Sequence, residues 1–158
     1  MSLRTRPWNR VAQPVYSLST TKDGKINMNI CTYVSPLTMK PKQFMLGVYH
    51  NTQTWHNLKQ TNQALLQVLS QDQSSLVRTL GKKSGQSYDK HSYLQSKVAY
   101  TKNLAYLTDC LAYIHLQTQS WIPESDHDLV IAKVISWKNI QEGVNLTTHH
   151  LKKLHIIG

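Results

Sequence analysis

The chain has 158 residues and only two cysteines, Cys31 and Cys110, which is typical of one domain that folds in a reducing compartment without disulfides. Lys and Arg number 18 against 8 Asp and Glu, and the formal net charge of +10 favours an anionic ligand or partner. No apolar run approaches the ~18 residues of a membrane-spanning helix and no apolar segment follows the basic N-terminus, so we predict one cytoplasmic domain over residues 1–158 that contacts no membrane.

The first third of the chain has the pattern of a β-hairpin. Residues 13–21 indicate a strand, and Asp23-Gly24 supplies a tight turn after it. From residue 26 to residue 34 apolar and polar side chains alternate, which predicts a second strand with one face in the core. Its other face is polar and should be accessible, and it carries Asn27, Asn29, Cys31 and Tyr33.

The middle of the chain alternates short strands with short helices. Pro36 and Pro41 predict a loop before the apolar run of residues 44–49, which is typical of a buried strand. A short helix should follow with Thr54 as its N-cap, because the hydroxyl of Thr54 can accept a first-turn amide hydrogen. Residues 64–69 predict a further strand, and Asp72 should cap a second helix that ends at Gly81.

The second half contains the two longest predicted strands. Residues 81–96 predict a polar loop, whereas residues 106–118 and 129–137 are rich in Ile, Val, Leu and Tyr and should pair with each other. About six strands and two short helices predict a mainly β fold, a small barrel with helical insertions.

Several classes of catalytic site are disfavoured. The segment Gly-Lys-Lys-Ser-Gly at residues 81–85 lacks the spacing of a nucleotide-triphosphate phosphate loop and follows a predicted helix. Neither a Gly-x-Ser-x-Gly elbow nor a neighbouring Cys and His supports a hydrolase. None of the eight histidines joins Cys, Asp or Glu at metal-ligand spacing, so no metal site is predicted.

The segment from His50 to Thr54 has the features of an anion site. It joins a buried strand to a helix N-terminus, where unpaired backbone N–H groups and the helix dipole both favour phosphate. The hydroxyls of Thr52 and Thr54 would add donors. Helix capping alone is the simpler interpretation of this segment taken by itself.

Five segments follow one another in an order that resembles the flavin reductase-like family of FMN-binding split-barrel proteins, over residues 14–137. They are residues 14–21 with Asp23-Gly24 and Asn27, residues 31–35 leading to Pro41, residues 48–54, residues 81–84 with Asp89-Lys90, and Ser125-Asp126-His127-Asp128-Leu129. The sequence departs from the family pattern at Ser125, where the family has Gly, and at His50-Asn51, where an aromatic residue or Arg is common.

The resemblance implies a six-stranded Greek-key split β-barrel that forms a homodimer and binds one FMN per barrel near the subunit interface. It places along the isoalloxazine ring Asn29, Ile30, Cys31, Thr32 and Tyr33, and near the phosphate Asn51, Thr52, Thr54 and Lys83, with His50 beside them. Asp126 and His127 would lie where NADH or NADPH meets the flavin and are the candidate catalytic residues.

We therefore expect an NAD(P)H-dependent flavin oxidoreductase in which the cofactor performs hydride transfer and the protein positions the reactants. Ser125 and His50-Asn51 leave open a non-catalytic FMN-binding or electron-carrier protein. A third interpretation is a nucleic-acid-binding domain that stacks bases on Trp8, Trp55, Trp121 and Trp137. The thin spread of lysines along the chain disfavours it, so no nucleic-acid partner is predicted.

Overall fold

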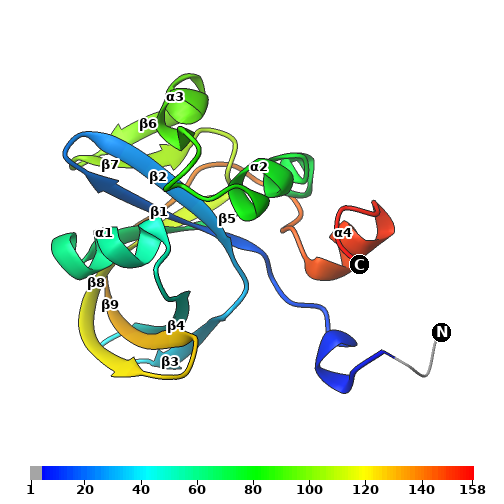
Figure 1. Cartoon of the computed structure of the whole chain (residues 1–158), viewed down its shortest axis with the longest axis horizontal. Coiled ribbons are helices and arrows are strands. Elements are labelled where there is room, and N and C mark those ends of the chain that lie inside the picture. Colours follow the sequence, from blue (N-terminus) through cyan, green and yellow to red (C-terminus); the bar gives the residue numbers. More distant parts are fainter. Residues whose placement is uncertain (1–4) are drawn as a thin grey trace.

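The computed structural model, which describes residues 5–158, is built on a seven-stranded antiparallel sheet in the order β2-β1-β5-β8-β9-β4-β3 (Figure 1). Its strands are β1 (Tyr16–Lys22), β2 (Lys25–Cys31), β3 (Val34–Thr38), β4 (Gln43–Tyr49), β5 (Gln63–Val68), β8 (Ala112–Pro123) and β9 (His127–Asn139). A separate hairpin consists of β6 (Val98–Thr101) and β7 (Leu104–Leu107). The helices are α1 (Gln53–Thr61), α2 (Leu76–Lys82), α3 (Lys90–Leu94) and α4 (Thr148–Lys153), with short 3-10 turns at η1 (Pro7–Asn9), η2 (Gln71–Gln73) and η3 (Gln95–Lys97).

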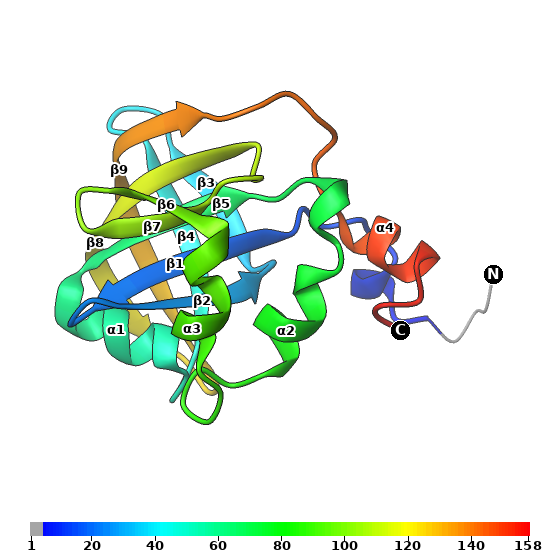
Figure 2. The same ribbon diagram turned by 90° about the horizontal axis from the view of Figure 1, so that it is seen from above.

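The sheet curls into a barrel because its two edge strands are neighbours in the chain. Only Thr32 and Tyr33 separate β2 from β3, so the two edges must meet at that point (Figures 1 and 2). The backbone N–H of Gly47 in β4 donates a hydrogen bond to the carbonyl of Tyr33 at 2.8 Å. A Cβ at position 47 would lie 2.9 Å from the Cβ of Tyr33, so only glycine admits this close approach.

The mainly β fold predicted from the sequence is confirmed, but the predicted number of six strands is wrong. The additional strand of the main sheet is β3, which lies where Pro36 and Pro41 predicted a loop, and the hairpin of β6 and β7 lies outside that sheet. Proline cannot donate a ladder hydrogen bond, but it is tolerated in an edge strand, where one side of the backbone needs no partner. Because β3 is an edge strand of the sheet, Pro36 does not prevent it from pairing with β4.

Other boundaries also differ from those predicted. The single strand predicted for residues 106–118 is wrong, because β7 ends at Leu107 and β8 starts at Ala112. The turn between them contains no Gly or Pro that would have indicated it. The predicted loop of residues 81–96 contains α3. Gly81 lies inside α2 and does not end it, and Ser75, not Asp72, precedes that helix.

The core has two large parts, one on each side of β1 and β2, and a smaller cluster of Leu65, Leu104 and Tyr113. Inside the barrel pack Leu18, Leu46, Leu58, Leu66, Leu116 and Val130. Outside it, Met28 of the hairpin packs in one cluster with Leu80 of α2, Leu94 of α3, Leu107 of β7, and Leu69 and Leu146 (Figure 2). Each fully buried leucine contributes ~1.5–3 kcal/mol. The hairpin is therefore covered on both faces, and the accessible face predicted for residues 26–34 is partly buried: Asn27 and Cys31 are both buried.

The helix α3 covers part of the free edge of β2. The N–H of Ile26 donates to Nδ1 of His91 at 3.1 Å, and the Lys90 ammonium donates to the carbonyls of Met28 (2.8 Å) and Leu80 (2.9 Å). In an antiparallel strand, alternate residues point their backbone groups to the same edge, so Ile30 presents its N–H and C=O there as well. An unpaired edge of this kind can pair with another extended or planar partner.

The buried carboxylate of Asp128 in β9 holds the start of α1 in place. It accepts hydrogen bonds from Nε1 of Trp55 and from Nε2 of His50, both at 2.8 Å, and lies 3.4 Å from Nζ of Lys59. Burial alone would raise the pKa of Asp128, but the bonds from Trp55, His50 and Lys59 outweigh it and the pKa lies below its ordinary value. The carboxylate therefore stays ionised and ties the β4–α1 connection to β9.

Lys90 should make the stability of the fold depend on pH. Its side chain is 5% exposed, and burial lowers its pKa from 10.5 to about 8. Between these values the unfolded chain binds a proton that the folded chain has released, so the free energy of unfolding should rise with pH, by up to ~1.4 kcal/mol per pH unit.

The buried thiols of Cys31 and Cys110, whose pKa values burial raises to about 11 and about 12, act in the opposite direction at high pH. To separate the two effects, the free energy of unfolding in urea should be measured from pH 7 to pH 9.5 for the wild type and for Lys90→Met, and the two values subtracted at each pH. The exposed Lys138→Met is the control. The difference should change with pH for Lys90→Met alone. Parallel profiles for all three proteins would contradict the prediction.

Replacing Asp128 should weaken the fold at neutral pH. Asp128→Ala leaves the half-buried side chains of Trp55 and His50 without their acceptor and removes the ion pair with the exposed Lys59, which should lower the free energy of unfolding by ~2–4 kcal/mol. Because the pKa of Asp128 is lowered, its contribution is present above the ordinary value of ~3.9 and is lost as the pH falls through the lowered one. Urea denaturation followed by tryptophan fluorescence measures the effect, and Asp109→Ala, on the surface, is the control. Equal stability of the two variants at pH 7 would show that Asp128 is dispensable.

Candidate functional site

Two adjoining cavities form a groove along β2. The larger, with a volume of about 500 Å³, lies between β2, the β4–α1 connection and the end of α2. The smaller, of about 230 Å³, lies where β2 ends, beside Gly47 and His127. Both are lined by Asn29, Ile30 and Tyr49, so they are continuous. We call the larger the α1 cavity and the smaller the β2-end cavity.

The structure brings together eleven of the twelve residues predicted to form the site. The β2-end cavity is lined by Asn29, Ile30, Cys31, Thr32, Tyr33 and His127. The α1 cavity is lined by His50, Asn51, Thr52, Thr54 and Lys83, together with Asn29 and Ile30. Asp126 lines neither cavity, but it contacts His127. Residues far apart in the sequence thus meet in one groove.

The β2-end cavity offers backbone and side-chain groups without partners. It lies along the part of the β2 edge that α3 leaves uncovered, where Ile30 presents an N–H and a C=O. The amide oxygen Oδ1 of Asn29 is buried and has no hydrogen-bond partner. A planar heterocycle with an N–H donor and carbonyl acceptors, such as the pyrimidine part of a flavin, would complement these groups.

Cys31 contributes backbone groups to this cavity and no reactive thiol. Its side chain is buried, and burial raises the pKa of the thiol to about 11 although a backbone hydrogen bond from Tyr33 partly offsets the effect. A thiol that stays protonated at neutral pH is a poor nucleophile. The prediction that Cys31 belongs to an accessible polar face is therefore wrong for its side chain.

The N-cap of α1 is Thr52, not Thr54 as the sequence predicted. The Thr52 hydroxyl accepts a hydrogen bond from the N–H of Trp55 (3.2 Å) and donates one to the carbonyl of Tyr49 (2.9 Å). Its proton is therefore not available to a ligand. Thr54 is buried, and its hydroxyl accepts from Nδ2 of Asn27 at 2.9 Å. Either threonine could cap from sequence alone, and the extended backbone of Thr52 decides between them. The donors left for an anion are the first-turn N–H groups of α1.

Lysines surround the same end of the groove. The α1 cavity is lined by Lys82, Lys83 and Lys90. Nζ of Lys83 lies 4.1 Å from the ring centroid of Tyr88, which holds this ammonium near the cavity. Sequence reasoning assigned no role to Lys90, because residues 81–96 looked like a solvated loop and no local pattern shows that a lysine becomes buried.

The segment from Ser84 to Tyr88 crosses the groove beside these lysines. Nε2 of Gln86 donates to the carbonyl of Asn51 at 2.5 Å, which ties the segment to the β4–α1 connection. Gly85 packs directly against the side chains of Asn27 and Gln53. The segment therefore forms one wall of the α1 cavity.

Two histidine–aspartate pairs, His127 with Asp126 and His50 with Asp128, lie at the start of β9. Nδ1 of His127 bonds to Oδ1 of Asp126 at 2.8 Å, and this bond lowers the pKa of Asp126. The His127 ring packs against Tyr33 and Tyr49 at centroid distances of 5.1 and 4.9 Å. Asp126 thus fixes the orientation of His127 and leaves Nε2 for other partners. His50 is bound to Asp128, so its Nε2 is occupied.

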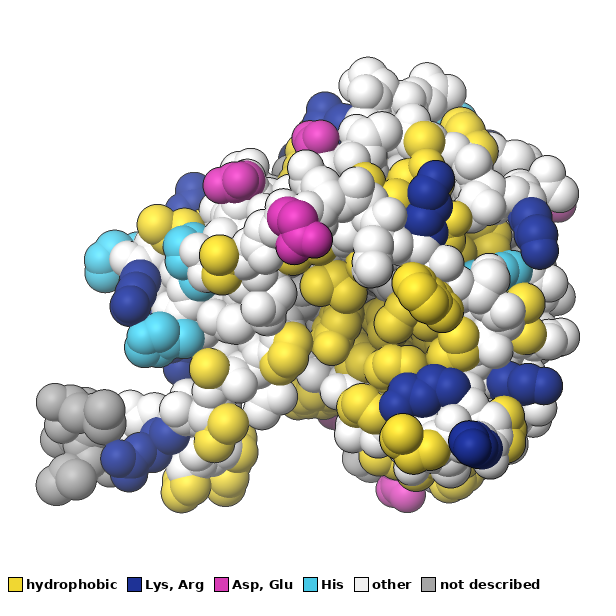
Figure 3. Space-filling view, turned by 180° about the vertical axis from the view of Figure 1, so that it is seen from behind, with side chains coloured by type: hydrophobic (Ala, Val, Ile, Leu, Met, Phe, Trp, Pro, Cys, Tyr) yellow, Lys and Arg dark blue, Asp and Glu magenta, His cyan; other side chains and the backbone are white. Residues whose placement is uncertain are grey.

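Further observations within residues 5–158 concern metal ligands, helix length and the tryptophans. No three His, Cys, Asp or Glu side chains there are grouped as metal ligands, and no helix has the length and apolar character needed to cross a membrane. Trp55 and Trp121 pack against the core under Lys59, which leaves Trp8 and Trp137 as the exposed tryptophans. On the face shown in Figure 3, Lys and Arg side chains are separated by other residues and form no continuous strip.

Comparison with known structures supports the fold. The flavin reductase PheA2 is 21% identical, with a TM-score of 0.75 over 89% of this chain and 87% of that one. BorF, the flavin reductase component of a bacterial two-component tryptophan halogenase, is 12% identical, with a TM-score of 0.81 over 90% and 89%. An FMN-binding protein from Thermus thermophilus is 17% identical, with a TM-score of 0.80 over 93% and 88%.

Sequence comparison gives the family. A search of curated proteins found no match. The family model described as "Flavin reductase like domain" matches residues 8–155, nearly the whole chain. The order of motifs, the barrel and this match agree, and the chain belongs to the flavin reductase-like family.

Proposed function

We propose that the protein is an FMN-binding oxidoreductase that uses NADH or NADPH to reduce flavin. The observation that carries the proposal is the continuous groove along β2, which has an open strand edge at one end and a helix N-terminus with three lysines at the other. These two ends match the two chemically different ends of FMN, a planar heterocycle and a phosphate. The proposal treats residues 1–158 as one cytoplasmic domain.

At the ring end, Ile30, Thr32 and Tyr33 would contact the isoalloxazine through backbone groups. The unpaired Oδ1 of Asn29 would accept a hydrogen bond from a hydroxyl of the ribityl chain. At the other end, the first-turn N–H groups of α1 and the Lys83 ammonium would hold the phosphate, since a helix N-terminus and a cation both favour an anion. Asn51, Thr52 and Thr54 would shape this end through their backbone positions.

Bound flavin would supply the hydride chemistry, so the chain itself needs to bind and orient the reactants. His127 would contact the pyridine nucleotide, because it lies at the ring end of the groove and the bond from Asp126 fixes its orientation. Tyr33 and Tyr49 would keep water from the reacting rings. In this arrangement no acid–base pair is required for turnover.

We further propose that the protein is a homodimer. Tyr33 and Tyr49 are 65% and 56% exposed, and both lie beside the β2-end cavity. Large aromatic side chains grouped on a surface favour a protein partner. A second subunit over this region would cover the ring end of the groove and exclude solvent from it.

A non-catalytic flavin-binding or electron-carrier protein is the second candidate function. It uses the same groove but needs no contact with a pyridine nucleotide. The observation that favours it is the position of Asp126, which lines neither cavity, together with Ser125 where the family pattern has Gly. The two candidate functions therefore differ in whether His127 contacts a pyridine nucleotide.

The phosphate contact can be tested by comparing FMN with riboflavin, which lacks the phosphate. The wild-type protein should quench flavin fluorescence on binding, and Lys83→Ala should weaken FMN binding by about three- to tenfold while leaving riboflavin binding unchanged. The exposed Lys133→Ala should bind both flavins as the wild type does. If Lys83→Ala weakened both flavins equally, the phosphate would not lie at this end, and a protein that binds neither flavin would refute the proposed function.

Turnover can be tested at His127. His127→Gln should lower kcat/KM for NADH and NADPH at least ~10-fold and change the dissociation constant of FMN much less, because the residue would contact the nucleotide and lies away from the phosphate contacts. Anaerobic stopped-flow mixing of the FMN-loaded protein with each nucleotide measures the loss of flavin absorption.

The exposed His149→Gln, on α4, is the matched control and should behave as the wild type does. Normal flavin reduction by His127→Gln would remove His127 from the reaction. A wild-type protein that binds FMN but is reduced by neither nucleotide would favour the carrier function.

A further inference from the structure

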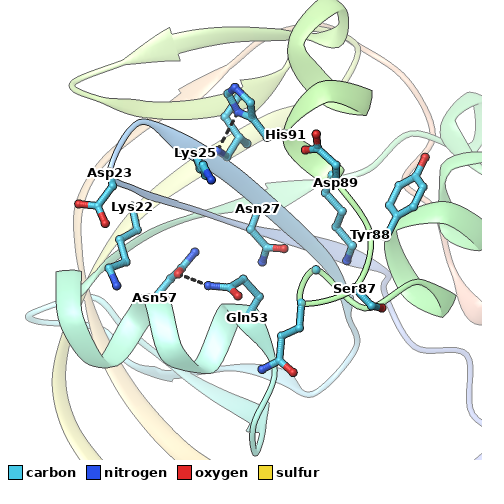
Figure 4. Close-up of a pocket in the computed structure, with 14 residues that line it drawn as sticks. Lys22, Asp23, Lys25, Asn27, Gln53, Asn57, Ser87, Tyr88, Asp89 and His91 are labelled. Carbon is cyan, nitrogen blue, oxygen red and sulfur yellow. Dashed lines mark hydrogen bonds between the residues drawn. The ribbon is translucent and has the colours of Figure 1, made fainter.

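A cavity of about 340 Å³ lies between residues 5–12 and the start of α4, apart from the groove. The cavity drawn in Figure 4 shares Asn27, Gln53, Gly85 and Lys90 with the α1 cavity, so it continues the groove. Among the described residues, none lines both the cavity at α4 and the groove. Figures 1 and 2 show its two segments side by side beyond α2, at the end of the molecule far from α1.

Hydrogen bonds join these two segments into one surface. The N–H of Gln13 donates to Oγ1 of Thr148, and the N–H of Thr148 donates to the carbonyl of Gln13, both at 2.9 Å. Nζ of Lys152 donates to the carbonyl of Asn9, also at 2.9 Å. Leu151 is buried in the core and holds α4 against the rest of the fold. The surface therefore has a fixed shape, although its two parts are far apart in the sequence.

This surface, which comprises residues 5–13 and 147–158 and which we call the terminal surface, is basic. Its sequence contains no Asp or Glu, and its basic side chains are Arg6, Arg10, Lys152 and Lys153, with His149, His150 and His155. The cavity itself is lined by Arg10, His149 and Lys152. Figure 3 shows His, Lys and Arg side chains together at this end of the molecule. The terminal surface therefore favours an anionic partner.

Exposed apolar side chains lie among these charges. Trp8 is 68% exposed, and Val11 and Leu154 are exposed as well. The guanidinium carbon of Arg6 lies 5.9 Å from the ring centroid of Trp8. Tryptophan and arginine are enriched among the side chains that dominate binding at protein interfaces. The combination therefore favours a partner that carries both carboxylates and apolar side chains.

A lipid surface or a nucleic acid fits the terminal surface less well. A helix that binds a lipid surface presents an apolar face to it, whereas Leu151 of α4 is buried in the core. Single-stranded nucleic acid is held by successive bases stacked on aromatic rings, and Trp8 is the one Trp, Tyr or Phe in the sequence of this surface. The recess between the two segments suits a side chain of a peptide.

We propose that the terminal surface binds an acidic segment of a partner protein. Carboxylates of the segment would pair with Arg6, Lys152 and Lys153, and an apolar residue beside them would pack on Trp8. The surface is separate from the groove, so the inference goes beyond the proposed function and does not rest on it. A partner held here would leave the flavin site open.

Charge-matched variants separate a specific surface from general attraction by a basic protein. The probe is a fluorescein-labelled peptide of Glu interspersed with Leu, and fluorescence anisotropy at physiological ionic strength gives its dissociation constant. The double variant Arg6→Gln and Lys153→Gln should weaken binding about tenfold. The double variant Lys40→Gln and Lys138→Gln removes the same charge from exposed positions elsewhere and should weaken binding less than about twofold, since distant charges are screened by salt.

The apolar part of the surface is tested at Trp8. Trp8→Ala should weaken peptide binding about fivefold, whereas Trp137→Ala, which removes a similarly exposed tryptophan from β9, should bind as the wild type does.

Three outcomes would overturn the inference. The first is equal weakening by the two double variants, which would show attraction by net charge alone. The second is the absence of peptide binding by the wild type. The third is tighter binding to phosphatidylserine vesicles or to a single-stranded RNA oligonucleotide than to the peptide. The measurements need no flavin, so a protein that binds the peptide but not FMN would refute the proposed function alone.

Discussion

The organisation of this protein depends on how the free edge of β2 is divided. One part of the edge is closed by two side chains of α3, a lysine that donates to the Met28 carbonyl and a histidine that accepts the Ile26 N–H. The rest stays open where β2 ends. A polar edge that is neither paired nor covered is available to a ligand, so the position at which the start of α3 meets β2 determines where the groove begins.

The second constraint is the two-residue link between β2 and β3. It draws the edges of the sheet together and forces Tyr33 against Gly47, which places an exposed aromatic ring beside the open end of β2. The Asp128 network fixes α1 at the other side of the same space. The groove therefore results from two features that also hold the fold together: the closure of the barrel and the anchoring of α1 to β9.

Sequence reasoning found the features that arise from local patterns. The Asp23-Gly24 hairpin, the buried strand β4, the pairing of β8 with β9 and a helix near Thr54 all follow from alternation, turn residues or caps, and the structure contains them, with Thr52 as the N-cap of the helix. The gathering of residues 29–33, 50–54, 83 and 127 into one groove followed from the family resemblance, since nothing local connects them.

What the sequence did not predict depends on contacts between distant segments. The strand β3 exists because Pro36 falls on a sheet edge, and edge position is a property of the whole sheet. Lys90 is buried because α2 and β2 both present carbonyls to it. Thr52 is the N-cap, and not Thr54, because the chain that leaves β4 is still extended at Thr52. Each of these outcomes needs the tertiary structure.

The close contact of Gly85 with β2 links two positions that are 58 residues apart. A Cβ at position 85 would lie 2.2 Å from Oδ1 of Asn27, which belongs to a buried side chain, and 3.0 Å from Cβ of Gln53, which is closer than a Cβ normally approaches either atom. Evolution can therefore enlarge residue 85 only after position 27 has become smaller. In homologous chains the two positions should covary, with a bulkier residue at one accompanied by Gly, Ala or Ser at the other.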